Sequence, residues 1–197
     1  MREPPENGAT FPYDPPMAIT ATIYHLKVTL SDVERGVYEA LDLRLARHPS
    51  ESMRYLVTRL LAYCLSYEEG IAFSKGGLST AEEPPIALYD LTGVLVAWID
   101  VGSPSAERMH RASKAARRVD LFTHADLALL KREAATRAIH KLEELRVFRL
   151  ATSFLDEIAE KLERSTKIEV VRNGEQIYVT IGSDAIEGEL SIASLVD

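Results

Sequence analysis

Two aspartates, Asp90 and Asp100, flank an apolar run whose composition is typical of a buried β-strand. Residues 94–101 are apolar except for Asp100, and a carboxylate in a strand buried on both faces is costly unless something binds it. Asp90 ends a shorter strand that begins at Ile86, and turn-forming residues 91–93 join the two strands. We therefore expect both carboxylates to meet across this hairpin, where their hard oxygen atoms suit Mg²⁺ or Mn²⁺.

A third carboxylate, Glu51, lies at the start of a helix predicted for residues 51–67. Ser50 precedes it and is a favoured N-cap residue, and apolar residues recur every three or four positions along the segment. An acid in the first turn has an ordinary explanation, because it complements the helix dipole. If this end of the helix faces the hairpin, however, Glu51, Asp90 and Asp100 form a metal site.

Basic side chains follow Asp100 along the helix predicted for residues 104–117. Arg108, Arg111 and Lys114 are three residues apart, so they share one helix face. Such a face is ordinarily a solvated surface, but this one follows directly after a buried acid. In a metal-dependent phosphodiesterase, these cations would bind the substrate phosphate and stabilise the transition state. The candidate catalytic residues are Asp90, Asp100, Arg108 and Arg111.

The length, composition and net charge of the chain, and the motifs it lacks, limit the other functions to be considered. The chain has 197 residues, 46% of them hydrophobic, and a net charge of -7, which disfavours a nucleic-acid partner although a local basic stripe would permit one. The single cysteine, Cys64, excludes disulfides and cysteine-based zinc sites. The five histidines are not spaced as metal pairs, and neither a nucleophile elbow nor a Walker A loop is present.

The elements that must position these residues follow from the hydrophobic periodicity. We expect a flexible leader over residues 1–17 and one mixed α/β domain over 18–197, with no membrane span and a cytoplasmic location. Asn173-Gly174 predicts a type I′ hairpin. The other expected elements are a hairpin over 18–47, a strand at 71–74, a loop at 76–85, strands at 119–123 and 146–150, helices at 124–145 and 152–162, and a last strand over 185–196.

Several motifs together resemble those of the bacterial YaeQ family, and the resemblance runs from Ala18 to the C-terminus. It implies a PD-(D/E)XK restriction-endonuclease-like fold, in which a mixed sheet and its helices follow the order helix–strand–strand–strand–helix–strand, here with N-terminal and C-terminal β-hairpins added. It also implies metal-binding acids at Glu51, Asp90 and Asp100. The motifs that carry the resemblance are LARHPSE (45–51), EEP (82–84), WIDVGSP (98–104) and VDLFTH (119–124).

Two departures from that pattern bear on function. Gly102 stands where the superfamily has its lysine, and Asp100 stands where YaeQ-type sequences usually carry Glu. The cations that the next helix offers instead include arginines, which stay charged and shuttle protons poorly. Three hypotheses therefore stay open: a metal-dependent nuclease, a catalytically degenerate binding or regulatory module, and a hydrolase of a small phosphorylated molecule. The sequence assigns neither a substrate nor an oligomeric state.

Overall fold

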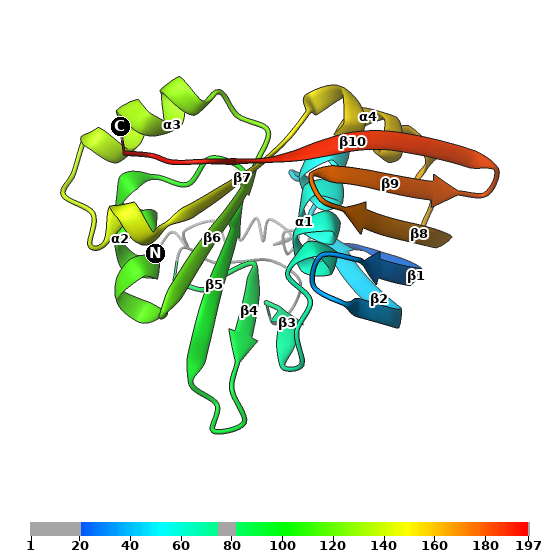
Figure 1. The fold of residues 1–197 in the computed structure, drawn as a ribbon, viewed down its shortest axis with the longest axis horizontal. Coiled ribbons are helices and arrows are strands. Elements are labelled where there is room, and N and C mark those ends of the chain that lie inside the picture. The colour runs from blue at the N-terminus through cyan, green and yellow to red at the C-terminus, as the bar shows by residue number, and fades with distance from the viewer. Residues whose placement is uncertain (1–20, 75–81, 197) are drawn as a thin grey trace, which may run out of the picture.

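A computed structural model describes residues 21–74 and 82–196, and in this part of the chain ten strands form one mixed sheet in the order β2-β1-β8-β9-β10-β7-β6-β5-β4-β3. The sheet curves into a nearly closed barrel (Figure 1). The leader predicted for residues 1–17 and most of the loop predicted for 76–85 lie outside the described residues. The strands are β1 (Thr22–Asp32), β2 (Val37–Arg47), β3 (Ile71–Phe73), β4 (Ile86–Tyr89), β5 (Leu95–Val101), β6 (Arg118–Thr123), β7 (Arg146–Leu150), β8 (Ser165–Asn173), β9 (Gln176–Ile181) and β10 (Asp184–Ala193).

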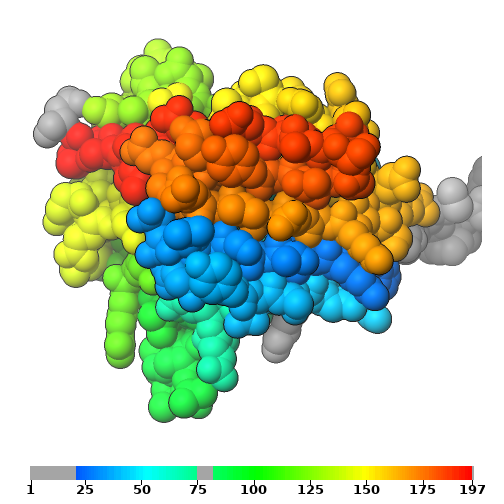
Figure 2. All heavy atoms as spheres, turned by 45° about the vertical axis from the view of Figure 1, so that its right-hand side comes forward, coloured from blue at the N-terminus to red at the C-terminus, as the bar shows by residue number. Residues whose placement is uncertain are grey.

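Strand β1 follows the alternation expected from its sequence. Tyr24, Leu26, Val28 and Leu30 are buried while the residues between them are exposed, because successive side chains of a strand point to opposite faces. β1 pairs antiparallel with β2 and parallel with β8. Figure 2 shows the outer face that results, with β1 and β2 in blue continuing directly into the orange and red β8–β10.

The hairpin between β8 and β9 is confirmed, but its turn differs from the predicted one. Asn173 pairs with Gln176, so the two residues of the connection are Gly174 and Glu175. Of these only Gly174 has a positive φ, whereas a type I′ turn needs a positive φ at both central residues. The prediction was one residue out of register because Asn173 continues the strand.

Strand β10 joins the two parts of the sheet. Residues 184–189 pair with β9, and residues 190–193 pair with β7. From β7 the sheet runs through the parallel strands β6 and β5 to the antiparallel strands β4 and β3. In Figure 1 β10 is the long red strand that crosses between the two parts. The sheet is therefore continuous, with β2 and β3 as its edges.

Helix α1 (Met53–Leu65) lies inside the curve of the sheet (Figure 1). Every residue from Leu56 to Leu65 is buried, which occurs only when a helix is covered on all sides. Helix α4 (Thr152–Lys161) packs on α1 and on β10, where a Cβ on Gly188 would lie 2.5 Å from the ring of Phe154. A glycine at that position is thus required by the close approach of α4.

A second, smaller core lies on the opposite face of β5, β6 and β7. There helices α2 (Ala106–Ala115) and α3 (Leu127–Ala135) pack against the sheet. Trp98 and Leu121 of the sheet and Met109 of α2 are among the side chains buried between them. A 3₁₀ turn (Leu142–Glu144) leads into β7. The 104–117 helix is shorter than predicted because Ser105 caps it, and the helix predicted for 124–145 ends at Ala135.

The predicted PD-(D/E)XK restriction-endonuclease-like class is wrong. The expected order of elements between residues 51 and 123 is present as α1, β3, β4, β5, α2 and β6, but these strands are only part of a ten-stranded sheet. The hairpins predicted as extensions at the two ends belong to that sheet, because His25 of β1 pairs with Ser165 of β8. This pairing joins segments far apart in the sequence, so no local pattern reveals it.

Candidate functional site

Asp90 lies in the tight turn between β4 and β5. Its Oδ1 accepts hydrogen bonds from Thr92 Oγ1 at 2.6 Å, Thr92 N at 2.9 Å and Val94 N at 3.0 Å. The bonds from the Thr92 hydroxyl and then the Val94 amide lower the pKa of the Asp90 carboxyl below its ordinary value. This is the bonding of a turn aspartate, which organises the hairpin locally.

The hairpin does not bring Asp90 and Asp100 together. Ile86 pairs with Ile99 at one end of the β4–β5 ladder, and the turn that holds Asp90 is at the other end. Val94 and Asp100 are six positions apart in the sequence, which at ~3.3 Å per residue is a span of about 20 Å. Figure 1 shows the turn as the projecting tip of this hairpin. The expectation that the two carboxylates meet is therefore wrong, because both strands are too long for it.

Asp100 is buried at the end of β5, and its carboxylate is held by donors on both oxygens. Oδ2 lies 2.6 Å from Arg108 Nε and accepts the indole N–H of Trp98 at 3.2 Å, while Oδ1 accepts the Val101 amide at 3.0 Å. The Arg108 guanidinium also lies 5.4 Å from the centre of the Trp98 ring, a cation–π distance. These contacts attach α2 to β5 and neutralise the buried charge.

Two acids that the sequence analysis gave no role, Glu82 and Glu83, contact the arginines of α2. Arg108 Nη2 donates to the backbone oxygen of Glu83 at 3.0 Å, and Arg111 Nη1 lies 3.5 Å from a carboxylate oxygen of Glu82. A signal for this was present: in an antiparallel hairpin, the residues just before the first strand must lie next to the end of the second. Glu82 and Glu83 precede β4, so they, and not Asp90, contact the arginines of the helix that follows Asp100.

Glu51 does not open the helix as predicted. The N-cap of α1 is Ser52, whose hydroxyl accepts from Tyr55 N at 3.1 Å. Glu51 Oε2 instead accepts the His48 amide at 3.1 Å and lies 3.4 Å from Arg59 Nη2. Each of the two acids that stand near core elements, Glu51 and Asp100, is thus paired with its own arginine.

The start of α1 does lie near the end of β5, as the metal-site hypothesis required. A Cβ built on Gly102 would be 3.6 Å from the ring of Tyr55, one turn after Glu51. Gly102 has φ +90°, a conformation that side chains other than glycine rarely adopt. The position that the lysine takes in the superfamily pattern is therefore unsuited to one here.

The basic residues predicted to face a phosphate are divided between different partners. Arg108 binds Asp100, and Arg111 lies within 3.5 Å of Glu82 and 3.4 Å of Glu107. Lys114 is exposed in the last turn of α2. Arg118 belongs to β6 and pairs with Glu68 at 2.9 Å.

Within residues 21–74 and 82–196, no three side chains of His, Cys, Asp or Glu are placed to hold a metal ion. Glu51, Asp90 and Asp100 do not converge, so the residues proposed as ligands do not fit a shared Mg²⁺ or Mn²⁺ ion. The expectation that the protein binds Mg²⁺ or Mn²⁺ stays a prediction. No helix in the described ranges is both long enough and apolar enough to cross a bilayer.

Two further buried acids, Asp32 and Asp120, were missed by the sequence analysis. Asp120 accepts hydrogen bonds from Nε and Nη2 of Arg146, each at 2.7 Å. Asp32 accepts one from Arg35 Nε at 2.7 Å. Their environment resembles that of Asp100, because each buried carboxylate is held by an arginine. Buried carboxylates paired with arginines therefore recur in this protein, so burial and pairing alone do not distinguish Asp100.

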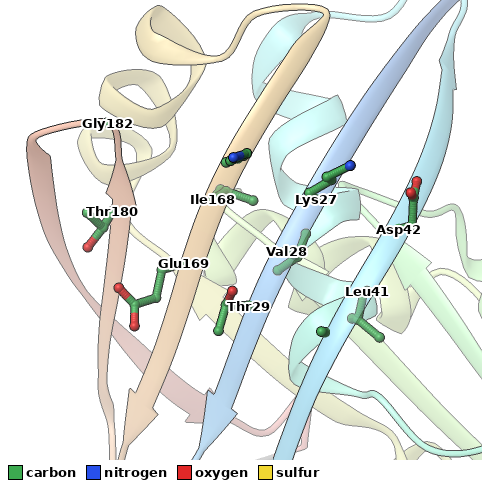
Figure 3. Close-up of a pocket in the computed structure, with 11 residues that line it drawn as sticks. Lys27, Val28, Thr29, Leu41, Asp42, Ile168, Glu169, Thr180 and Gly182 are labelled. Atoms are coloured by element: carbon green, nitrogen blue, oxygen red, sulfur yellow. The ribbon is translucent and has the colours of Figure 1, made fainter.

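Two of the hollows on the described part of the chain lie next to β2. The larger, about 680 Å³, lies on the outer face of β1, β2, β8 and β9. Figure 3 shows Lys27, Asp42 and Glu169 along it, and Lys167 lines it too, so its charged side chains balance and its shape is open. The smaller, about 270 Å³, lies between the two edges of the sheet and contains Arg59 in its wall.

A mixed sheet that curves around one buried helix, with its buried acids bound by arginines, defines the class of this protein. The profile of the family described as YaeQ protein matches residues 17–190. The chain belongs to the YaeQ family.

Individual relatives agree with this assignment. The uncharacterized protein YaeQ of Escherichia coli (strain K12) is 36% identical over 108 residues, which are 55% of this chain and 59% of that protein. The protein of the same name from Salmonella typhi gives the same identity and coverage. The aligned stretch thus spans less than two thirds of these curated relatives.

Solved structures extend the likeness to nearly the whole fold. The crystal structure of the YaeQ protein from Pseudomonas syringae superposes with a TM-score of 0.79 at 29% identity, covering 88% of this chain and 96% of that one. The YaeQ protein from Xanthomonas axonopodis pv. citri superposes with a TM-score of 0.80 at 26% identity, covering 89% and 99%. The curved ten-stranded sheet is accordingly the fold of this family.

Proposed function

We propose that this protein acts as a binding module and not as a metal-dependent phosphodiesterase. The observation that carries the proposal is that both oxygens of the Asp100 carboxylate accept hydrogen bonds from within the protein, from Arg108, Trp98 and the Val101 amide. An acid that holds a catalytic Mg²⁺ presents its oxygens to the ion and its waters. Asp100 presents them to an arginine and an indole within the protein.

The chemistry of the neighbouring cations supports the same proposal. Arg108 lies on Asp100, so it contributes to packing between α2 and β5 more directly than to a phosphate. Gly102 supplies no general base, and the arginines that remain are always protonated at neutral pH. The absence of a three-residue metal-ligating group among the described residues also supports the proposal.

The proposal is tested by an assay for hydrolysis. The wild-type protein and Asp100→Asn are incubated with single- and double-stranded DNA and RNA, and with bis-p-nitrophenyl phosphate and p-nitrophenyl phosphate, in Mg²⁺ or Mn²⁺. We expect no substrate to be cleaved faster by the wild-type protein than by the variant. Metal-dependent cleavage that the variant loses, with its circular dichroism spectrum unchanged, would overturn the proposal in favour of the nuclease or the phosphatase hypothesis.

A further inference from the structure

The outer face of β1, β2, β8 and β9 carries exposed side chains in rows that cross the four strands, around the hollow of about 680 Å³ (Figure 2 and Figure 3). The paired strands hold these rows in register, because each residue lies beside its partner on the next strand. The first row consists of Asp42 on β2, Lys27 on β1 and Lys167 on β8. The second row, two residues away on each strand, consists of Ala40, Thr29, Glu169 and Thr180. Both rows line the hollow.

Two lysines lie next to each other in the first row. Lys27 and Lys167 are directly opposite on β1 and β8, and like charges at such positions destabilise a sheet. Asp42 is opposite Lys27, and Glu169 is two residues from Lys167 on the same strand. None of these four exposed side chains is held in an ion pair by the described part of the chain. Their charges are therefore available to a partner.

The outer face differs in charge from the protein as a whole. Its charged residues on these four strands are three basic and two acidic side chains, so the face has a net charge of +1 with histidine neutral; they are Lys27, Arg44, Lys167, Asp42 and Glu169. The whole chain has a net charge of -7. Two copies of so acidic a protein repel each other on average. The outer face is a surface through which they can meet without that repulsion.

A third row, next to the second, adds aromatic side chains. Ser31 of β1 lies beside Tyr38 of β2 and Val171 of β8, and Val171 lies beside Tyr178 of β9. Tyr38 is 63% exposed and Tyr178 is 40% exposed. Tyrosine is enriched at protein–protein interfaces, because its ring buries a large area while its hydroxyl still reaches a hydrogen-bond partner. Two exposed tyrosines beside a hollow are therefore typical of an interface with another protein surface.

The rows are complementary to one another when the face meets a second copy of itself. A twofold axis that runs across the strands, midway between the first and second rows, places the first row of each copy on the second row of the other. Lys167 then faces Glu169 of the second copy, and the symmetry repeats this contact. The same axis places Arg44, which lies beside His25 in the next row, on Tyr38 of the second copy, where a cation–π contact can form. An interface between identical copies about a twofold axis requires this self-complementarity.

The size of the face is sufficient for such an interface. Small residues of the second row line the hollow, so two sheets can approach closely there. Four strands spaced at ~4.8 Å, each of 6 to 11 residues at ~3.3 Å per residue, give a face of about 600 Å². Two copies together would bury about 1,200 Å², which is the lower end of the range for specific interfaces.

We propose that the outer face of β1, β2, β8 and β9 is a dimer interface, on which a second copy of this chain docks about a twofold axis that crosses the strands. The dimer contains two ion pairs between Lys167 and Glu169 of opposite copies, and Arg44 of each copy lies on Tyr38 of the other. This inference goes beyond the proposed binding function and does not depend on it.

The test is sedimentation equilibrium of the full chain over a range of protein concentrations. We expect a reversible dimer, with a mass that rises from 21.9 kDa towards twice this value as the concentration increases. A chain that stays monomeric at about 1 mM would overturn the proposal. Binding of a single-stranded oligonucleotide or an acidic peptide to that monomer would identify a different occupant of the face.

Charge reversal tests the proposed register of the two faces. Lys167→Glu and Glu169→Lys should each weaken the dimer about tenfold or more, because each variant places two pairs of like charges in contact across the twofold axis. The double variant Lys167→Glu/Glu169→Lys restores opposite charges at both contacts, so its dissociation constant should return to within about threefold of the wild type. Arg137→Glu makes the same change in net charge as Lys167→Glu but lies after α3, outside the face. This matched control should dimerise within about twofold of the wild type.

Thermal melts separate association from folding. All these variants should melt close to the wild type, because the substituted side chains are exposed. A dimer that persists unchanged in both single variants, or a double variant that dimerises no better than they do, would overturn the proposed interface. Neither result bears on hydrolysis: cleavage that depends on Asp100 would reject the proposed function, whatever the oligomeric state.

Discussion

Arg108 Nε lies 2.6 Å from Asp100 Oδ2, and the two side chains are 17% and 6% exposed. The pair joins α2 to the end of β5 and leaves the acid no oxygen without a donor. The nuclease hypothesis predicts that Asp100 is a metal ligand, whereas in the structure Asp100 binds Arg108 and so holds α2 against β5. The consequences of this difference are measurable in the stability of the protein as well as in its activity.

Removing the acid should destabilise the protein. We expect Asp100→Asn to lower the free energy of unfolding by about 2 kcal/mol or more, because the variant leaves Arg108 partly buried without its counter-ion. Urea denaturation measures this. The matched control is Glu144→Gln in the exposed pair with Lys141, which should change stability by at most about 0.5 kcal/mol. A double-mutant cycle with Arg108→Met should give a coupling energy of about 1–3 kcal/mol, and additive effects would refute the structural role.

Introducing the missing lysine should not create an active site. We expect Gly102→Lys to lose about 1–3 kcal/mol of stability, because a side chain at φ +90° strains the backbone, and to gain no hydrolytic activity. Gly36→Lys is the control, since Gly36 also has a positive φ but nothing within 4 Å of its Cβ position. Thermal melts and the phosphodiester assay check both variants. Metal-dependent cleavage by Gly102→Lys would contradict this prediction, because it would show that the site lacks only the lysine of an active nuclease.

The ring of His124 should make stability depend on pH. Burial, and to a smaller degree the charge of Arg54, lowers the pKa of His124 below 6.5, while Asp156 opposes the shift. The unfolded chain therefore takes up the proton at a higher pH than the folded protein, so stability is complete above about pH 6.5 and falls as the pH drops towards the lower pKa of the folded state. Replacing the ring in His124→Gln should flatten this slope in urea denaturation between pH 7 and 5. An unchanged slope would show that titratable groups other than His124 cause the pH dependence of stability.

The thiol of Cys64 should be inert in the folded protein. Cys64 is fully buried in α1, and burial raises the pKa of its thiol to about 12. A thiolate is the reactive species, so Ellman's reagent should label the protein only after it unfolds. Stoichiometric labelling in seconds under native conditions would mean that α1 is not enclosed as described.

Local patterns predicted the elements well and their assembly poorly. The alternation in β1 and the central hairpin follow from side-chain periodicity, which the sequence displays directly. The start of α1 was misplaced by two residues because Ser50 and Ser52 are equally good N-cap residues by type. The order of strands in the sheet was not predicted, because pairing such as that of β1 with β8 depends on contacts between distant segments.

For the candidate site, too, single residues were easier to predict than the contacts between them. The burial of Asp100 was predicted correctly because a charge in an apolar strand is conspicuous, and the residue is 4% exposed. Its arginine partner was assigned to a phosphate instead, since spacing on a helix does not show which way a side chain folds back. Asp120 and Arg146 are paired across parallel strands, 26 residues apart, and no sequence signal marks such a pair.

The most direct test of the central claim uses the indole N–H of Trp98, which is the single tryptophan of the chain and donates to Asp100 Oδ2. Its resonance in a ¹H–¹⁵N spectrum reports on any paramagnetic ion at that carboxylate. During titration with Mn²⁺ we predict no broadening of the indole resonance beyond that of exposed backbone amides. Selective loss of the indole signal at stoichiometric Mn²⁺, restored in Asp100→Asn, would contradict the claim and place a metal ion at Asp100.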